Sequence, residues 1–246
     1  TPTLYPGRVT GYETHVWDSH GKLIYEDAIP GFSTCDGIGL DKDANIYILA
    51  AMNRIVDGKP YFLRWNETLV KMPPKKGKVI STAEGIPVKI GSEADLKGPV
   101  DGQMWKAGKA RVEGAEWFYG GVGLTDLPCI CWNARPALDF FARSFVPEID
   151  HYSVAVLDTA GNLILRVGQY GNVDDGKPLD AVGGSQSPRS IGGDEVALFN
   201  AAYLATHSDR RLFIADGGNG RILSVKLGYH AEEKTALKDV LDEAKK

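Results

Sequence analysis

The chain has 246 residues, of which 43% are apolar and 24% are charged, and this ordinary globular composition argues against a disordered chain or a fibre. Its formal net charge of −4 argues against a nucleic-acid partner, which is normally bound through a basic stripe. No apolar run approaches the roughly 18–20 residues that a helix needs to cross a bilayer, so we expect no membrane span.

Short strands are predicted along most of the chain, in units that repeat. Period-two alternation and turns rich in Asp, Asn and Gly favour antiparallel strands over helices. The units lie near residues 12–31, 35–70, 129–168 and 199–229. In the second unit we expect the third strand at 61–65. The repetition indicates one supersecondary element that is used several times.

The three fuller units share their turn residues as well as their apolar runs. In each unit a first apolar run ends in a polar residue, namely Asp41, Asp139 and His207. A second run carries an aromatic residue, and a polar turn residue follows six positions later. These pairs are Tyr47 and Asn53, Phe145 and His151, and Phe213 and Asn219. The regularity predicts equivalent strands and turns in the three units.

Two stretches interrupt the repeat. Residues 71–115 are rich in Lys, Pro and Gly and are interpreted as an insertion, whereas residues 171–198 form a connector rich in Gly, Ser and Asp. After the last unit, residues 231–246 carry apolar side chains at helical spacing on a polar background, which predicts a short C-terminal helix.

The last unit carries the most specific motif, Leu212-Phe213-Ile214-Ala215-Asp216 followed by Asn219-Gly220-Arg221-Ile222, with looser copies at Asn53-Arg54-Ile55 and His151-Tyr152-Ser153. The motif resembles the blades of the NHL family of β-propellers. The resemblance implies an all-β, NHL-like β-propeller of four-stranded blades over residues 1–230, and it specifies no activity. Propellers close with about four to eight blades. We therefore expect either a degenerate blade within 71–115 or an incomplete propeller, finished by the rest of its own protein or by another chain.

The cysteines are candidate ligands for a soft or borderline metal such as zinc or copper. Cys35 lies six residues before the Asp that ends its first run, and Cys131 and Cys129 lie eight and ten residues before theirs. Even offsets place the three thiols on one face, near the channel mouth of a propeller. His207 is a candidate further ligand. The alternative is that the cysteines fill the core and that His207 caps a turn.

Oxygen ligands for calcium are offered by Asp174, Asp175 and Asp180 in the glycine-rich connector. Their spacing does not match an EF-hand loop, and the alternative is a solvated turn rich in Asp and Asn.

A candidate binding surface is formed by Trp117, Tyr119, Trp132 and Arg135, which are residue types enriched in interface hot spots and able to stack on sugars. The alternative is that these side chains hold neighbouring blades together.

The preferred function is a propeller scaffold that binds a protein or glycan partner through its loops and channel mouth. No Gly-x-Ser-x-Gly elbow and no evident Ser/His/Asp set occurs in the sequence. The alternative is a metal-dependent or redox enzyme with its site at the channel mouth, near the cysteines. The start at Thr1 rather than Met, together with a propeller of this type, leads us to expect a secreted or periplasmic location.

Overall fold

The computed structural model describes residues 4–5, 8–9, 14–30, 35–62, 66–81, 98–103, 108–123, 134–172 and 196–228. These residues form β-sheets that are antiparallel almost throughout, and the helical segments among them are two short 3₁₀ helices, η3 (Ile149–His151) and η4 (Gly217–Asn219). The predicted all-β class is confirmed. The helix predicted at 231–246 lies outside the described residues.

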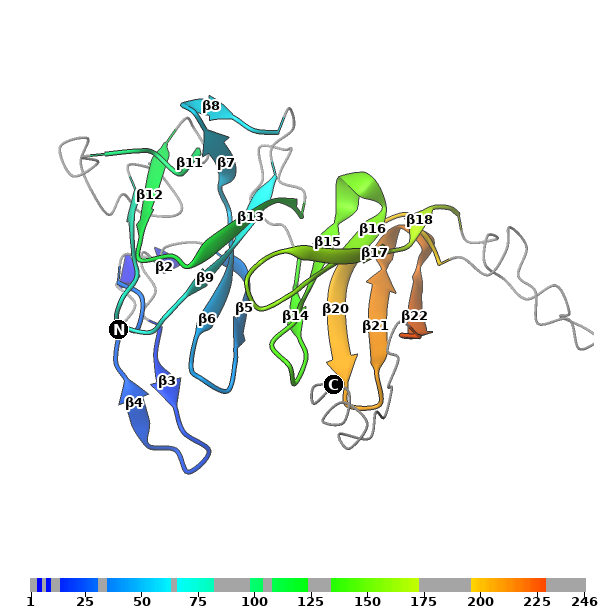
Figure 1. The fold of residues 1–246 in the computed structure, drawn as a ribbon, viewed down its shortest axis with the longest axis horizontal. Coiled ribbons are helices and arrows are strands. Elements are labelled where there is room, and N and C mark those ends of the chain that lie inside the picture. The colour runs from blue at the N-terminus through cyan, green and yellow to red at the C-terminus, as the bar shows by residue number, and fades with distance from the viewer. Residues whose placement is uncertain are drawn as a thin grey trace, which may run out of the picture.

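Three sheets have their strands in chain order from one edge to the other (Figure 1). The first contains β5 (Cys35–Leu40), β6 (Ile46–Ala50), β9 (Glu67–Met72) and β13 (Trp117–Val122). The second contains β14 (Ala137–Leu138), β15 (Ser144–Glu148), β16 (Ser153–Leu157) and β17 (Leu163–Val167). The third contains β20 (Ala201–His207), β21 (Arg211–Asp216) and β22 (Arg221–Lys226).

The third strand of the first sheet is β9, and the prediction of a strand at 61–65 was wrong for the described part of that segment, since residues 61–62 form a bend. Every residue of β9 is buried, whereas the side chain of Tyr61 is 66% exposed. A central strand needs apolar residues on both faces, and Leu69, Val70 and Met72 provide them.

A separate five-stranded sheet occupies much of the stretch between β6 and β13. Its order is β10 (Lys78–Ser81), β12 (Lys109–Glu113), β11 (Gly102–Gln103), β7 (Asn53–Val56) and β8 (Lys59–Pro60). The segment interpreted as an insertion thus contributes β10, β11 and β12, which join strands that precede β9.

Small strand pairs complete the described fold. The antiparallel pairs are β1 (Leu4–Tyr5) with β2 (Arg8–Val9), and β3 (Val16–Trp17) with β4 (Leu23–Tyr25). The parallel pair is β18 (Gln169–Tyr170) with β19 (Ala197–Leu198).

The first strands of the three sheets lie side by side. Arg135, just before β14, forms a parallel bridge to Tyr203 of β20. On the other side of β14, glycines permit a close approach to β5. A Cβ atom on Gly37 would lie 2.4 Å from the ring of Pro136, and one on Gly39 would lie 2.8 Å from the side chain of Leu138. A larger residue at either position would push β5 away from β14.

The sheets pack face to face through apolar clusters. On β6, Ile48 faces a cluster shared with β9 and β12, whereas Leu49 faces a cluster shared with the second sheet. On β15, Val146 joins that second cluster, and Phe145 joins a third cluster shared with β20 and β21. Because neighbouring residues of a strand point to opposite faces, these strands bury both sides. The sheets are therefore stacked one against the next.

One tight turn recurs between paired strands. An Asp carboxylate oxygen accepts hydrogen bonds from the backbone N–H groups two and four residues later, at 2.8–2.9 Å. The turns begin at Asp18, Asp41, Asp139 and Asp158. The residue three positions after the Asp has a positive φ in each, and these residues are Gly21, Ala44, Ala142 and Gly161. In the turn, the carboxylate oxygen accepts the hydrogen bonds that backbone N–H groups within a strand would donate to a neighbouring strand.

None of the described residues forms a helix that is long and apolar enough to cross a membrane.

Candidate functional site

A hollow of about 390 Å³ opens where the first and second sheets meet. It is named the upper hollow because β7, one of the strands that line it, is drawn in the upper part of Figure 1. Its lining comes from β7, the bend after β8, β13, β15, η3 and β17. The lining includes Arg54, Tyr61, Phe62, Phe118, Tyr119, Glu148 and Arg166.

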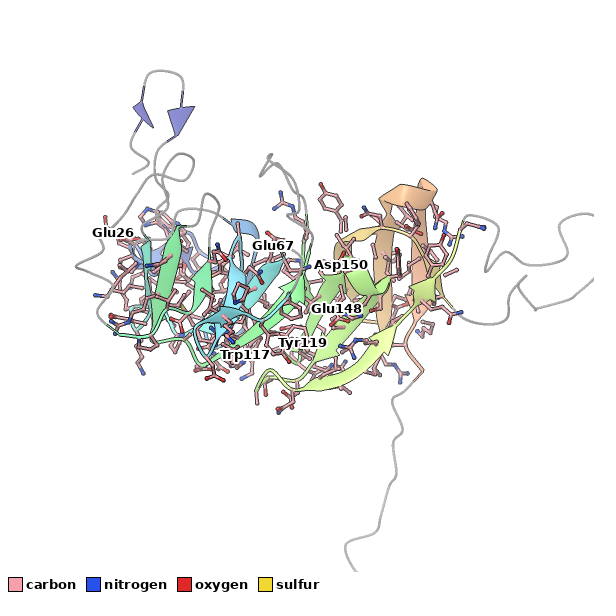
Figure 2. The ribbon with its side chains drawn as sticks, turned by 90° about the horizontal axis from the view of Figure 1, so that it is seen from above. Glu26, Glu67, Trp117, Tyr119, Glu148 and Asp150 are labelled. Atoms are coloured by element: carbon pink, nitrogen blue, oxygen red, sulfur yellow. The ribbon has the colours of Figure 1, made fainter. Side chains whose placement is uncertain are left out.

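Glu148 is the central polar group of the upper hollow, and only 3% of it is exposed. Its Oε1 accepts hydrogen bonds from the Tyr119 hydroxyl at 2.7 Å and from Arg166 Nη2 at 3.1 Å. Its Oε2 accepts from Arg166 Nε at 2.6 Å and from the Ser153 hydroxyl at 3.1 Å. Figure 2 shows Tyr119 and Glu148 together in the middle of the molecule. Both carboxylate oxygens are therefore engaged.

The surroundings of Glu148 favour its ionised form. Burial alone would raise the pKa, but hydrogen bonds from Arg166 and Tyr119 and the charge of Arg166 outweigh burial and lower it. Burial and the hydrogen bond to Glu148 together raise the pKa of Tyr119. Tyr119 therefore stays protonated and donates a hydrogen bond to the ionised Glu148 carboxylate.

Aromatic rings form the other wall of the upper hollow. The Arg54 guanidinium lies 4.0 Å from the centre of the Phe118 ring, in a cation–π contact, and Arg54 Nη1 donates to the carbonyl of Asp101 at 2.8 Å. Tyr61 and Phe62 meet edge to face, with their ring centres 4.8 Å apart. These contacts fix Arg54 and Phe62, whereas the Tyr61 ring stays largely exposed.

Two glycines of β13 shape the bottom of the upper hollow. A Cβ atom on Gly120 would lie 2.8 Å from the Phe62 ring, and one on Gly121 would lie 2.6 Å from it. Gly121 also has a φ of +81°, at the bulge where β13 shifts its register against β9. The lack of side chains at these two positions lets the Phe62 ring approach β13 closely.

The predicted binding surface is divided by the structure. Tyr119 lies in the upper hollow. Trp117, two residues earlier on β13, packs against the Tyr47 ring and donates its indole N–H to the carbonyl of Thr159 in the second sheet. Trp117 thus links two neighbouring sheets. This agrees with the alternative role given for it above, which is to hold neighbouring blades together.

Arg135 lies apart from the upper hollow, in the backbone bridge between β14 and β20. Its N–H donates to the carbonyl of Ala202 at 2.8 Å, and its carbonyl accepts from Leu204. Its side chain is exposed. Trp132 lies outside the described residues.

The structure places His207 in a turn equivalent to the Asp turns. Its Nδ1 lies 3.2 Å from the amide nitrogen and 2.7 Å from the carboxylate of Asp209, and Arg210, three positions after it, has a φ of +66°. Contact with His207 is the main cause that lowers the pKa of Asp209. His207 therefore takes the place that Asp41 and Asp139 take, as a turn residue.

His207 and Cys35 are not brought together. Cys35 begins β5 and His207 ends β20, and the turns that follow both strands lie on the same lower edge in Figure 1. The two residues therefore stand at opposite ends of their strands. Cys129 and Cys131 lie outside the described residues, so the zinc or copper site stays a prediction.

The calcium candidates Asp174, Asp175 and Asp180 also lie outside the described residues, and calcium stays a prediction. Within the described part of the chain, no group of three or more His, Cys, Asp or Glu side chains is arranged to hold a metal ion.

Sequence reasoning missed Glu148, Arg166 and Arg54. A signal for Glu148 was present, since it follows Phe145 by three positions, as Asp216 follows Phe213. Each acid directly precedes a 3₁₀ helix that ends in a residue of left-handed conformation. The φ values of the acids themselves are similar, −97° for Glu148 and −90° for Asp216. Asp216 accepts backbone N–H groups, whereas Glu148 is one methylene longer and reaches Arg166 on β17.

No protein-family model matches the sequence, and none of the curated proteins matches it. The resemblance to NHL propellers therefore stays a prediction. Among solved structures, the chain is similar to selenomethionine-substituted virginiamycin B lyase from Staphylococcus aureus, with 10% identity, coverage of 80% of this chain and 71% of that chain, and a TM-score of 0.23. A TM-score this low carries no argument about fold or activity, and the function has to be inferred from the chain's own site.

Proposed function

We propose that the protein is a non-catalytic binding scaffold of the β-propeller type, complete or part of a larger one, and that the upper hollow holds a glycan. The observation that supports this most is the pairing of an exposed aromatic ring, Tyr61, with a fixed network of polar groups centred on Glu148 and Arg166.

A sugar ring has apolar C–H faces and hydroxyl groups around its edge, so it suits a site with a flat aromatic ring on one side and polar groups on the other. Tyr61 offers the flat ring. Arg166 offers N–H donors, because 44% of its side chain remains exposed although Glu148 holds it in place. The volume of about 390 Å³ lies within the range of small-ligand sites.

The state of Glu148 favours binding over catalysis. A general acid needs a raised pKa so that it carries a proton near neutral pH, whereas the pKa of Glu148 is lowered. A general base or nucleophile needs a free oxygen, whereas both oxygens of Glu148 accept hydrogen bonds from Tyr119, Arg166 or Ser153. Glu148 therefore serves to hold Tyr119 and Arg166 in position.

The propeller architecture is supported by the arrangement of the three main sheets. They share one strand order, their first strands lie side by side, and their faces stack through apolar clusters. Blades around a central axis have the same relationships. In such a scaffold the upper hollow lies between two blades, where side chains from both contribute.

A glycan array tests the proposal. Wild-type protein is expected to bind a subset of glycans, and the binding is expected to fall by at least about tenfold in Tyr61→Ala, which removes the exposed ring. Tyr170→Ala is the matched control, because Tyr170 is a similarly exposed tyrosine, 62% accessible, that does not line the upper hollow. Absence of binding to every glycan, or equal binding by the two variants, would contradict the proposal.

A further inference from the structure

A second hollow, of about 220 Å³, lies on the opposite edge of the molecule and is named the lower hollow. It opens between the turn that joins β14 to β15 and the turn that joins β20 to β21, which are both at the lower edge in Figure 1. Its lining includes Phe140, Phe141, Arg143, His207, Arg210 and Arg211. None of these residues lines the upper hollow.

Phe140 and Phe141 are exposed to an extent that the fold does not explain, at 82% and 66%. They occupy the second and third positions of the Asp139 turn. The same positions hold Ser19-His20, Lys42-Asp43, Thr159-Ala160 and Ser208-Asp209 in the equivalent turns. The turn requires an acceptor at its first position and a positive φ at its fourth, and it leaves the middle positions free.

The repeats thus act as an internal control. Each of the other turns folds with at least one polar residue at these positions, so the Asp139 turn would fold without its phenylalanines. Exposure of two neighbouring aromatic rings to water is unfavourable, and their burial against a partner would lower the free energy. Phe140 and Phe141 meet edge to face with ring centres 5.6 Å apart, which leaves their outer faces available.

The charges around the two rings are mainly positive. Arg143 is held by Asp139 and lies 5.4 Å from the centre of the Phe141 ring. Arg211 is held by Asp209. The ion pairs of the described residues here involve His207, Arg211 and Lys226 with Asp209, and none involves Arg210, although the chain as a whole carries a net charge of −4. The lower hollow is therefore a locally basic and aromatic surface on an acidic protein.

From this combination we propose that the lower hollow docks an acidic peptide segment of a partner protein. An apolar side chain of the segment covers Phe140 and Phe141, and its carboxylates face Arg210 and the arginines beside it. Arginine and aromatic residues together are the composition of interface hot spots, and the basic rim selects an acidic segment. The docking is independent of the glycan proposed for the upper hollow.

The sharpest test exchanges sequences between turns. The double variant Phe140→Lys, Phe141→Asp gives the Asp139 turn the residues of the Asp41 turn, which has the same hydrogen bonds. The reciprocal variant Lys42→Phe, Asp43→Phe places the same two rings on a different turn. Arg210→Gly removes the charge, and glycine readily adopts the positive φ found there.

The probe is a fluorescent synthetic peptide of glutamate and leucine, with a lysine and leucine peptide as its control, and binding is followed by fluorescence anisotropy. We expect the acidic peptide to bind wild-type protein, and the exchange in the Asp139 turn to weaken it by at least about tenfold. Arg210→Gly should weaken binding severalfold, and the reciprocal variant should not strengthen it. Unchanged far-ultraviolet circular dichroism and unchanged binding of an array-selected glycan would show that the exchanged chain is folded.

Several results would overturn the proposal. One is equal binding of the acidic and basic peptides, and another is binding that survives the exchange. Sedimentation that shows self-association through Phe140 and Phe141, without peptide binding, would assign the surface to a second copy of the chain instead. Failure of the acidic peptide to bind wild-type protein would also reject the proposal, and it would leave the glycan site in the upper hollow untouched.

Discussion

The hydroxyl of Tyr119 donates a hydrogen bond of 2.7 Å to Glu148, and this bond joins the last strand of the first sheet to the second strand of the second sheet. A parallel link lies nearby, where the Asn66 side-chain amide donates to Asp150 at 3.1 Å. Figure 2 shows Glu148 and Asp150 at the same junction. Tyr119 and Glu148, which line the upper hollow, thus also hold the two sheets together.

Removal of the Tyr119 hydroxyl should lower stability. Tyr119→Phe deletes one hydrogen bond to a buried charged group, so we expect the free energy of unfolding to fall by about 1.5–3 kcal/mol. Urea unfolding followed by tryptophan fluorescence measures the change. Tyr170→Phe is the control, since that side chain is exposed, and it should change stability by less than about 0.5 kcal/mol. Equal effects of the two variants would show that the bond to Glu148 contributes nothing.

Acid should remove the contribution of Glu148 to the stability of the fold. Its folded pKa is lowered from the ordinary value of 4.5, so the unfolded chain binds the proton more readily than the folded one. The stabilisation is therefore fully present above the unfolded pKa and is lost as the pH falls through the folded pKa. We expect the difference in unfolding free energy between wild type and Glu148→Gln to shrink below about pH 4.5. A constant difference from neutral pH to about pH 3 would argue against this assignment.

Two glycines in equivalent turns should respond differently to alanine. Gly21 and Gly161 have φ values of +80° and +83°, but a Cβ atom on Gly161 would lie 2.6 Å from the Trp117 ring, whereas one on Gly21 meets nothing within 4 Å. Gly21→Ala should cost about 1–2 kcal/mol from the backbone alone. Gly161→Ala should cost about 1–3 kcal/mol more, because Trp117 has to move. Thermal unfolding of both variants gives the comparison, and equal costs would mean that Trp117 yields freely.

His207 should tolerate replacement by asparagine. An Asn side chain offers an acceptor for the Asp209 amide, as the Asp residues do in the equivalent turns. We expect His207→Asn to change stability by less than about 0.5 kcal/mol and His207→Ala to lower it by about 0.5–1.5 kcal/mol. Plasma mass spectrometry of protein purified without chelators completes the test. A loss of bound zinc or copper in the Asn variant would make His207 a ligand instead.

The parts of the fold that follow local rules were predictable from the sequence. The Asp turns depend on residues within a few positions of each other, so spacing identifies them. The equivalence of His207 with Asp41 and Asp139 was predicted in the same way, and the structure places His207 in the same kind of turn.

The upper hollow could not be predicted by such rules. Its network joins Tyr119, Glu148 and Arg166, which are 29 and 18 residues apart and lie on different strands. Their meeting depends on how the sheets stack and on the pairing of β9 with β13 across a long intervening segment. Period-two alternation shows which face of a strand is buried, but it does not show which sheet lies against that face. From the sequence alone, Glu148 is therefore indistinguishable from an ordinary acidic residue at the end of a strand.

A crystal structure of the protein with an array-selected glycan would test the central claim most directly. The account predicts a sugar ring in the upper hollow, with its apolar face over Tyr61 and a hydroxyl group within hydrogen-bonding distance of Arg166. The Glu148 carboxylate should keep its bonds to Tyr119 and Arg166 in the complex. A glycan bound elsewhere on the surface, or a ligand that displaces Arg166 from Glu148, would contradict the account.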